Sequence, residues 1–278
     1  MFHILKKFVL NYRRERFLNG LPLQGYTQHL NEIPFVDTLS DADLAELNHL
    51  LQWQCFTVDC HGRRFGNAAW EGKRGEPQSI PDRRIVLMHQ FFNLSDKHLL
   101  EVGCFEGIHT IGLSQYARQV TAIDARIENV VKTIVRCAFF GCHPTIFQYN
   151  IEEQTTNFDR LSADLMHHVG VLYHLKDPVR HLKKIGQYIR LGLMIDTHYA
   201  EDTDADETYE VDGKSYRYKK YKESGVSDVF SGVYDHAKWL RLSDIIETLK
   251  ISGFGKVEII EERKERNGPR VLLMAQRG

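Results

Sequence analysis

Short apolar runs alternate with amphipathic segments from residue 98 to residue 198. The apolar runs predict buried strands at 98–104, 119–124, 144–150, 164–171 and 192–198. The segments between them have helical spacing, at 106–117, 126–140 and 177–189. One side of the second helix carries most of its apolar residues and is expected to be buried: Ile127, Val130, Val131, Ile134 and Val135. This alternation is typical of the α/β class, in which crossover helices connect parallel strands.

The order of elements changes after residue 198. A polar, acidic and Tyr-rich stretch at 199–234 has no clear period, and its length predicts a functional lid or binding loop. A helix at 238–251 follows, and then two apolar runs at 256–262 and 270–276, which Asn267-Gly268 joins as a hairpin. The whole predicts a doubly wound, mostly parallel seven-stranded sheet with an antiparallel strand in its C-terminal hairpin.

Residues 1–97 differ in kind from the rest of the chain. Ser40 introduces a helix at 41–53, and a stretch rich in Gly, Arg and Pro follows it at 61–84. We expect a helical and irregular N-terminal cap at 1–97. A Rossmann-like domain would then occupy 98–278, with the insertion at 199–234.

Composition narrows the class of partner. The 278 residues include 36 Lys+Arg against 37 Asp+Glu, so a nucleic acid or an anionic membrane would need a local basic patch. No apolar run approaches the roughly 18 to 20 residues of a membrane helix. Five cysteines, an odd number, predict reduced thiols and a cytoplasmic protein. The sequence leaves the oligomeric state open, a homo-oligomer included.

The clearest chemical signal is the segment Glu101-Val-Gly103-Cys-Phe-Glu-Gly107, which ends a strand and opens a helix. Its glycines let backbone amides approach a ligand at a helix N-terminus. Asp124 ends the next strand, where a carboxylate can accept both hydroxyls of a ribose. After the third strand, Asn150 and Ile151 offer an amide and an apolar contact to an adenine ring. Three consecutive strand ends therefore predict one nucleoside site.

With these motifs, residues 98–276 resemble the class I, seven-stranded, S-adenosylmethionine-dependent methyltransferases. The resemblance implies S-adenosyl-L-methionine as cofactor, with Glu101, Gly103 and Gly107 around its methionine part. It likewise implies Asp124 on the ribose and Asn150 with Ile151 near the adenine. Two departures are visible, because Phe105 and Asn150 stand where many members have glycine and aspartate. A nicotinamide enzyme would need Gly-x-Gly-x-x-Gly, which this turn does not supply.

The string Gly170-Val-Leu-Tyr-His-Leu, followed by Asp177-Pro178, resembles a subgroup that includes the tRNA wobble-uridine carboxymethyltransferases. Two shorter matches to the same subgroup are Trp70-Glu-Gly-Lys73 and Arg270. This resemblance implies that Trp70 and Lys73 contact the transferred group of the cofactor. It places Tyr173 and Arg270 on the substrate.

Three histidines fall at or just beyond the ends of the strands that border the methyl-transfer site in this fold. An alcohol acceptor needs its proton removed, and histidine suits that role near neutral pH. We rank His198 first, because Asp196 shares its strand face and would raise the basicity of the imidazole. His174 ranks second and His168 third. The acidic residues around Asp196 leave metal assistance as an alternative, but a solvated loop is the usual outcome and we assign no metal site.

The sequence therefore predicts an S-adenosylmethionine-dependent methyltransferase that methylates a small molecule or saccharide, at oxygen. Transfer of a methyl or cofactor-derived group to RNA, such as a tRNA wobble uridine, is the first alternative, with Arg83-Arg84 and the basic N-terminus as contacts. A non-catalytic protein that binds S-adenosylmethionine is the second, and the intact Gly103, Gly107 and Asp124 argue against it.

Overall fold

The computed structural model describes residues 39–59, 61–67, 76–152 and 158–278. Trp70, Lys73 and the basic N-terminus therefore lie outside the described residues. The chain divides into two compact units. The first comprises Met1–Asp96, Cys104–Val120 and Arg126–Phe147, and the second comprises Lys97–Gly103, Thr121–Ala125 and Gln148–Gly278.

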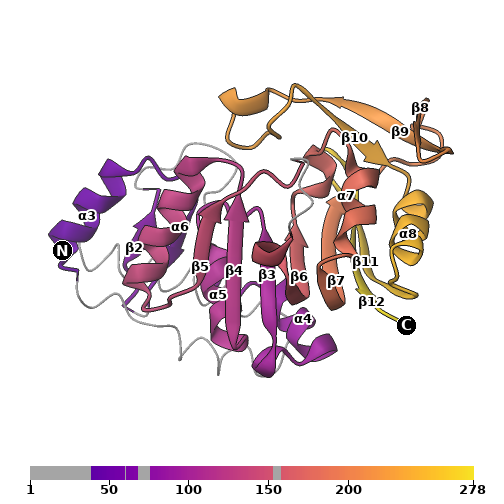
Figure 1. Cartoon of the computed structure of the whole chain (residues 1–278). Coiled ribbons are helices and arrows are strands. Elements are labelled where there is room, and N and C mark those ends of the chain that lie inside the picture. The colour runs from indigo at the N-terminus through magenta and orange to yellow at the C-terminus, as the bar shows by residue number, and fades with distance from the viewer. Residues whose placement is uncertain (1–38, 60, 68–75, 153–157) are drawn as a thin grey trace. The chain divides into compact units, whose positions relative to one another are not determined.

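Seven strands form one mixed sheet in the order β11-β12-β7-β6-β3-β4-β5 (Figure 1). Their bounds are β3 (His98–Val102), β4 (Gln119–Asp124), β5 (Thr145–Gln148), β6 (Ala163–Val169), β7 (Ile189–His198), β11 (Lys256–Glu265) and β12 (Gly268–Gln276). β6 pairs in parallel with both β3 and β7, whereas β12 is antiparallel to β7 and to β11. The predicted fold class, with its late antiparallel hairpin, is confirmed.

The second unit also contains α7 (Pro178–Ile185) and α8 (Leu242–Ile251), which pack against each other. The short helices η2 (Asp159–Leu161) and η3 (Leu172–His174) precede them, and η4 (Gly225–Ser227) lies in the insertion. Asp177 caps α7, because its side chain accepts a hydrogen bond from the backbone of Arg180 and Pro178 follows at the first helical position. The Asp-Pro pair in the sequence is thus a helix start.

The insertion, in which the sequence showed no clear period, contains a regular sheet, and its role as a functional lid or binding loop stays a prediction. β8 (Glu207–Val211), β9 (Lys214–Lys222) and β10 (His236–Leu240) form a separate antiparallel sheet in the order β10-β9-β8 (Figure 1). In β9 the buried positions are Tyr216 and Tyr218, and lysines fill many of the others. A small core supports this sheet, composed of Ala200, Ala205, Ala237 and Trp239 with Tyr173 and Tyr221 against it. β10 also takes residues that we expected to begin the following helix.

The first unit contains most of the described N-terminal segment. Its elements are α3 (Asp41–Leu50), β1 (Phe56–Val58), β2 (Arg64–Gly66), α4 (Arg83–Phe92), η1 (Leu94–Asp96), α5 (Ile108–Tyr116) and α6 (Ile127–Phe139). Ser40 and Asp43 form a capping box at the start of α3, as Ser40 predicted. One hydrophobic core joins the N-terminal elements to α5 and α6: Leu44, Trp53, Cys55, Phe65, Ile80, Val86, Ile108, Ile111, Cys137 and Phe140. These N-terminal residues thus share a core with two helices of the methyltransferase domain.

The buried face of α6 is not the one that its apolar spacing predicted. Val130 is buried, but Ile127, Val131 and Ile134 are 58%, 44% and 46% exposed. The interior positions are taken by polar and charged side chains, which are Asn129, Lys132, Thr133 and Arg136. The spacing of apolar residues shows that a helix has an apolar face, but it does not show which face is buried. In α6 the buried face is the charged one, and its side chains form a buried polar network. Among the described residues, no helix is both long and apolar enough to cross a bilayer.

Candidate active site

The turn that leaves β3 can be built only with glycine. Glu101 is buried at the end of β3, and Gly103 follows it with φ +75. The Gly103 amide donates to the carbonyl of Ile123 at 2.8 Å. A Cβ at this position would lie 2.4 Å from Cγ2 of Val171, inside van der Waals contact. The sequence prediction that this glycine permits a close backbone approach agrees with that geometry.

The second and third strand ends carry the polar residues predicted for a nucleoside. Asp124 ends β4 almost completely buried, and its backbone carbonyl accepts from Tyr149 at 2.9 Å. The side-chain oxygen of Asn150 accepts from the Glu152 amide at 3.1 Å, and Ile151 between them is partly buried. Asp124 therefore presents a carboxylate at a strand end, whereas the oxygen of Asn150 also stabilises its own turn.

Gly107 lies in the first unit, as the N-cap of α5 with φ +81. A Cβ there would lie 3.0 Å from the backbone of Thr133 in α6, so the loop and α6 approach each other closely. Phe105, two residues earlier, has φ +51, a left-handed backbone conformation that residues other than glycine rarely adopt. This is the position at which many members of the resembled family have glycine.

Tyr173 lies next to the other residues that the sequence predicted to contact the acceptor or to act as the base. Its ring centroid lies 4.2 Å from that of His174 and 4.8 Å from that of His198. The Arg270 guanidinium carbon lies 5.4 Å from the Tyr173 ring. A Cβ at Gly170, just past the end of β6, would lie 3.7 Å from the Tyr173 hydroxyl and 3.9 Å from Nη2 of Arg270. The structure thus brings together Tyr173, Arg270 and two of the three predicted histidines.

His198 lies in an apolar stack. Its ring is parallel to that of Trp239 with centroids 4.9 Å apart, and its Nδ1 is 3.0 Å from the carbonyl oxygen of Pro269. A carbonyl only accepts, so Nδ1 carries the proton and Nε2, 3.7 Å from Glu265, is the basic nitrogen. Burial lowers the pKa of His198, and this outweighs the opposing effects of Glu265 and Asp196. Asp196 thus raises the basicity of His198 as expected, but burial keeps the pKa of the imidazole below its ordinary value.

Asp196 is occupied by arginines. Its buried carboxylate accepts from Nη2 of Arg263 at 2.8 Å and from Nε of Arg270. Burial would lower the pKa of Arg263, but Asp196 raises it above its ordinary value. Asp202 and Asp204 of the insertion likewise face the cationic side chains of Arg241 and Lys219. These acidic residues form ion pairs rather than gathering around a metal ion.

His174, ranked second from the sequence, has a carboxylate partner at Nδ1, where His198 has a backbone carbonyl. Its Nδ1 lies 2.7 Å from Oε1 of Glu223, whose other oxygen accepts from the Gly232 amide at 3.2 Å. The pairing fixes the proton on Nδ1 and leaves Nε2 as the basic nitrogen. The His174 side chain is 20% exposed, against 3% for His198. Sequence reasoning missed Glu223, because no motif connects two residues 49 positions apart.

His168 is a core residue. It is fully buried, and its Nε2 lies 2.9 Å from Nε2 of His181 in α7. Burial lowers the pKa of His168 to about 4. A ring enclosed in this way cannot contact an acceptor that arrives from solvent, and we do not retain it as a candidate base.

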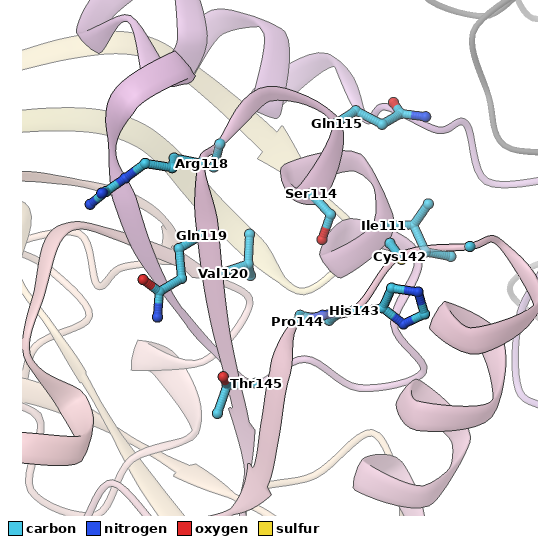
Figure 2. A pocket seen from close by; sticks show the side chains of 12 residues that line it. Ile111, Ser114, Gln115, Arg118, Gln119, Val120, Cys142, His143, Pro144 and Thr145 are labelled. Atoms are coloured by element: carbon cyan, nitrogen blue, oxygen red, sulfur yellow. The ribbon is translucent and has the colours of Figure 1, made fainter.

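A separate pocket in the first unit is lined by residues at the amino ends of β4 and β5 and by the end of α5 (Figure 2). Ser114, Arg118, Cys142 and His143 are among its lining residues. Among the described residues, none of those predicted for the cofactor or the acceptor lines it. In open α/β sheets, ligands bind at the opposite, carboxyl ends of the strands. The pocket is therefore not part of the candidate active site.

The fold and the strand-end groups define a class I methyltransferase domain. Residues 100–192 match the family model described as a methyltransferase domain. This part of the chain is thus a methyltransferase domain, and its cofactor is S-adenosylmethionine. The glycine turn at Gly103 and the nearly buried carboxylate of Asp124 fit this cofactor, because the turn has no room for a side chain and the carboxylate stands at the next strand end.

Two further comparisons describe its relatives. The ubiquinone biosynthesis O-methyltransferase of Coxiella burnetii is 22% identical over 197 residues, which cover 68% of this chain and 76% of the relative. The crystal structure of the N-terminal domain of EvdMO1 with SAH bound superposes with a TM-score of 0.72 and 20% identity, covering 86% of this chain and 98% of that one. A second structure of that domain, in the presence of SAH and D-fucose, has a TM-score of 0.71.

A methyltransferase from Methanosarcina mazei shares the fold at a TM-score of 0.51 and 14% identity, over 69% of this chain and 96% of that one. These relatives support the general class and give no support to the finer resemblance to tRNA carboxymethyltransferases.

Proposed function

We propose that the enzyme methylates a hydroxyl group of a small polar acceptor, of the saccharide class, beside Tyr173. The observation that carries this proposal is that His174 and His198 both contact the Tyr173 ring, each with Nδ1 directed at a hydrogen-bond acceptor. Two imidazole Nε2 atoms are thereby left basic where an alcohol would lose its proton. The O-methyltransferase named among the relatives and the domain crystallised with D-fucose agree with this acceptor chemistry.

The cofactor supplies an activated methyl group on a sulfonium, so the protein needs little covalent chemistry of its own. Gly103 would lie against its amino-acid part and Asp124 would accept hydrogen bonds from its ribose hydroxyls. The remaining tasks are to align the acceptor oxygen, to exclude water and to remove the proton. Arg270 and Tyr173, which converge above Gly170, would orient the acceptor by donating hydrogen bonds to its oxygen atoms.

His174 is the preferred base. The Glu223 carboxylate fixes its tautomer and stabilises the imidazolium that forms when Nε2 takes the acceptor proton. Its side chain is also the more accessible of the two. His198, whose pKa burial lowers, is the weaker base and serves as a packing partner between Tyr173 and Trp239. This order reverses the ranking from the sequence.

The test is methyl transfer to a panel of monosaccharides and phenols, followed as SAH formation and as product mass. We expect His174→Gln to lower turnover by roughly 10² to 10⁴, without changing SAH affinity in calorimetry. Glu223→Gln should reduce turnover less and change its pH profile. A loss confined to His198→Gln would move the base to His198.

Bulk tRNA belongs in the same panel. Methyl or carboxymethyl groups that appear on RNA, and on none of the small acceptors, would overturn the proposal. Tight SAH binding with no product from any acceptor class would instead favour a protein that binds the cofactor without catalysis.

A further inference from the structure

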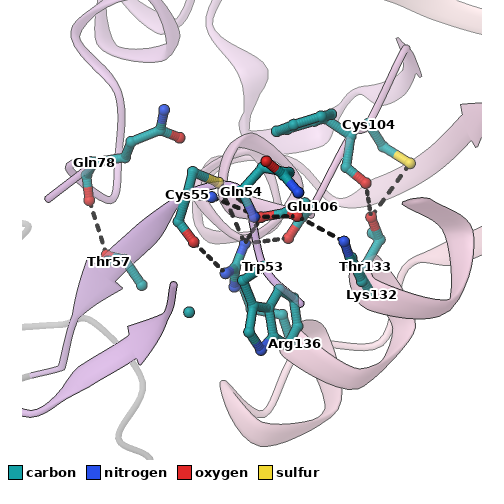
Figure 3. A network of polar contacts seen from close by, with 12 residues as sticks. Trp53, Gln54, Cys55, Thr57, Gln78, Cys104, Glu106, Lys132, Thr133 and Arg136 are labelled. Carbon is teal, nitrogen blue, oxygen red and sulfur yellow. Dashed lines mark hydrogen bonds and ion pairs between the residues drawn. The ribbon is translucent and has the colours of Figure 1, made fainter. Parts of the chain in front are cut away.

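A buried ion cluster lies directly beneath the cofactor loop 104–107 (Figure 3). Glu106 of the loop faces Lys132 and Arg136, which project from α6. Oε1 of Glu106 is 3.1 Å from Nζ of Lys132, and Oε2 is 3.9 Å from Nη1 of Arg136. Their side chains are almost completely buried. Ions removed from water in this way are stable only when the remaining donors and acceptors are satisfied.

The N-terminal segment supplies several of these partners, and Glu128 of α6 pairs with Nζ of Lys132 at 2.6 Å. The Glu106 carboxylate accepts from the Gln54 amide at 2.8 Å and from the Cys55 amide at 3.1 Å. Lys132 donates to the carbonyl of residue 52 at 3.0 Å, and Arg136 donates to that of Cys55 at 3.2 Å. Residues 52–55, which we call the strap, thus supply two donors to the anion and an acceptor to each cation. The guanidinium also lies 4.2 Å from the Trp53 ring.

The same cluster orients the backbone of the loop. Arg136 donates to the carbonyl of Glu106, and the Thr133 hydroxyl donates to that of Phe105 at 3.1 Å. Peptide groups are planar and trans, so fixing the Phe105 carbonyl toward α6 turns the Glu106 amide away from it. The Gly107 amide closes the turn on Cys104 at 2.9 Å. Phe105 between them is held at φ +51, which is unfavourable for a residue with a Cβ.

We propose that the strap acts through Glu106 to hold the loop 104–107 in the geometry that binds S-adenosylmethionine. Glu106, Lys132 and Arg136 are then positioning residues. Their function is to stabilise the left-handed backbone conformation of Phe105. Glycine at this position would adopt that conformation without such support. A strained backbone conformation persists only when the surrounding structure holds it in place. Here four hydrogen bonds hold Phe105 and Glu106.

The first experiment is calorimetric titration of the full chain with SAH. Glu106→Gln keeps the shape of the side chain but places an amide group among three donors. We expect SAH affinity to fall by about 10- to 100-fold. Ile80→Val, in the same core, is the matched control, because it removes one methylene from the unit and none of the polar groups that contact the loop. A purely structural role predicts that both variants lose affinity only in proportion to their drop in Tm, and that result would overturn the proposal.

The second experiment isolates the backbone strain. Phe105→Ala and Phe105→Gly both lose the ring, but only glycine relieves the positive φ. In the Glu106→Gln background we expect the glycine variant to bind SAH about fivefold more tightly than the alanine variant, and the two to differ less when Glu106 is intact. An equal difference in both backgrounds would show that the cluster does not hold this turn. If Glu106→Gln does not fold, Glu106→Asp replaces it in the same cycle.

Discussion

Replacing Phe65 tests whether the N-terminal segment belongs to the core of the methyltransferase domain. Phe65 of β2 is completely buried, and its ring stacks on Phe140, the C-cap residue of α6, at 5.6 Å and meets Trp53 edge-on at 5.5 Å. Phe65→Ala removes the whole ring from between these neighbours. Truncation of a buried Phe costs about 3 to 5 kcal/mol, because the surroundings collapse only partly into the cavity. That is a large fraction of the roughly 5 to 15 kcal/mol that stabilises a domain.

The assay is urea unfolding followed by far-UV circular dichroism, with SAH affinity measured in parallel. We expect the midpoint of the whole transition to fall, since the ring packs against α6 as well as against N-terminal residues. Val226→Ala is the control, because this side chain is 72% exposed and its loss should change the free energy of unfolding by less than about 0.5 kcal/mol. A loss below about 1 kcal/mol for Phe65→Ala would refute the reasoning. So would a separate early transition that leaves SAH binding intact, since the segment would then be a detachable cap.

Three further outcomes follow from the geometry. Asp124→Ala should weaken SAH binding by tens to hundreds of fold through lost charge-assisted hydrogen bonds, and equal affinity in calorimetry would contradict the ribose assignment. Gly103→Ala should abolish SAH binding, because its Cβ would lie 2.4 Å from Val171 at a φ of +75, and a variant that binds normally would contradict this account. Burial lowers the folded-state pKa of His168 to about 4 and that of His181 well below 6.5, so the unfolded chain binds more protons. Stability should therefore fall as the pH drops from about 6.5 toward 4, which urea midpoints at several pH values measure, and a flat profile would contradict the burial of this pair.

The strands of the main sheet could be predicted because buried parallel strands are nearly continuous apolar runs. The insertion could not, because β9 mixes tyrosine with lysine and arginine without a regular period, and its buried side chains belong to a residue type that is also common in loops. For a related reason, the sequence predicted the wrong face of α6 to be buried. Its interior carries Lys132 and Arg136, whose partners come from residues far away in the sequence.

The candidate site was predictable where it depends on strand ends. Tyr173 follows β6, His198 ends β7 and Arg270 lies at the start of the antiparallel β12, so the fold alone brings them to one edge. The order of the bases was not predictable, because it depends on which carboxylate each imidazole meets. Asp196, next to His198 in sequence, is taken by two arginines, and Glu223 arrives from the inserted sheet.

The strap also constrains the order in which the chain can fold during synthesis. Cys55 is separated from Glu106 by 51 residues and from Arg136 by 81. A nascent chain emerges N-terminus first, so the strap and its neighbours leave the ribosome well before α6 exists. Until then, Trp53 and Phe65 have no helix to pack against, and non-local contacts of this kind form slowly. The described N-terminal residues of this core therefore remain exposed to chaperones and to aggregation until residue 140 has been made.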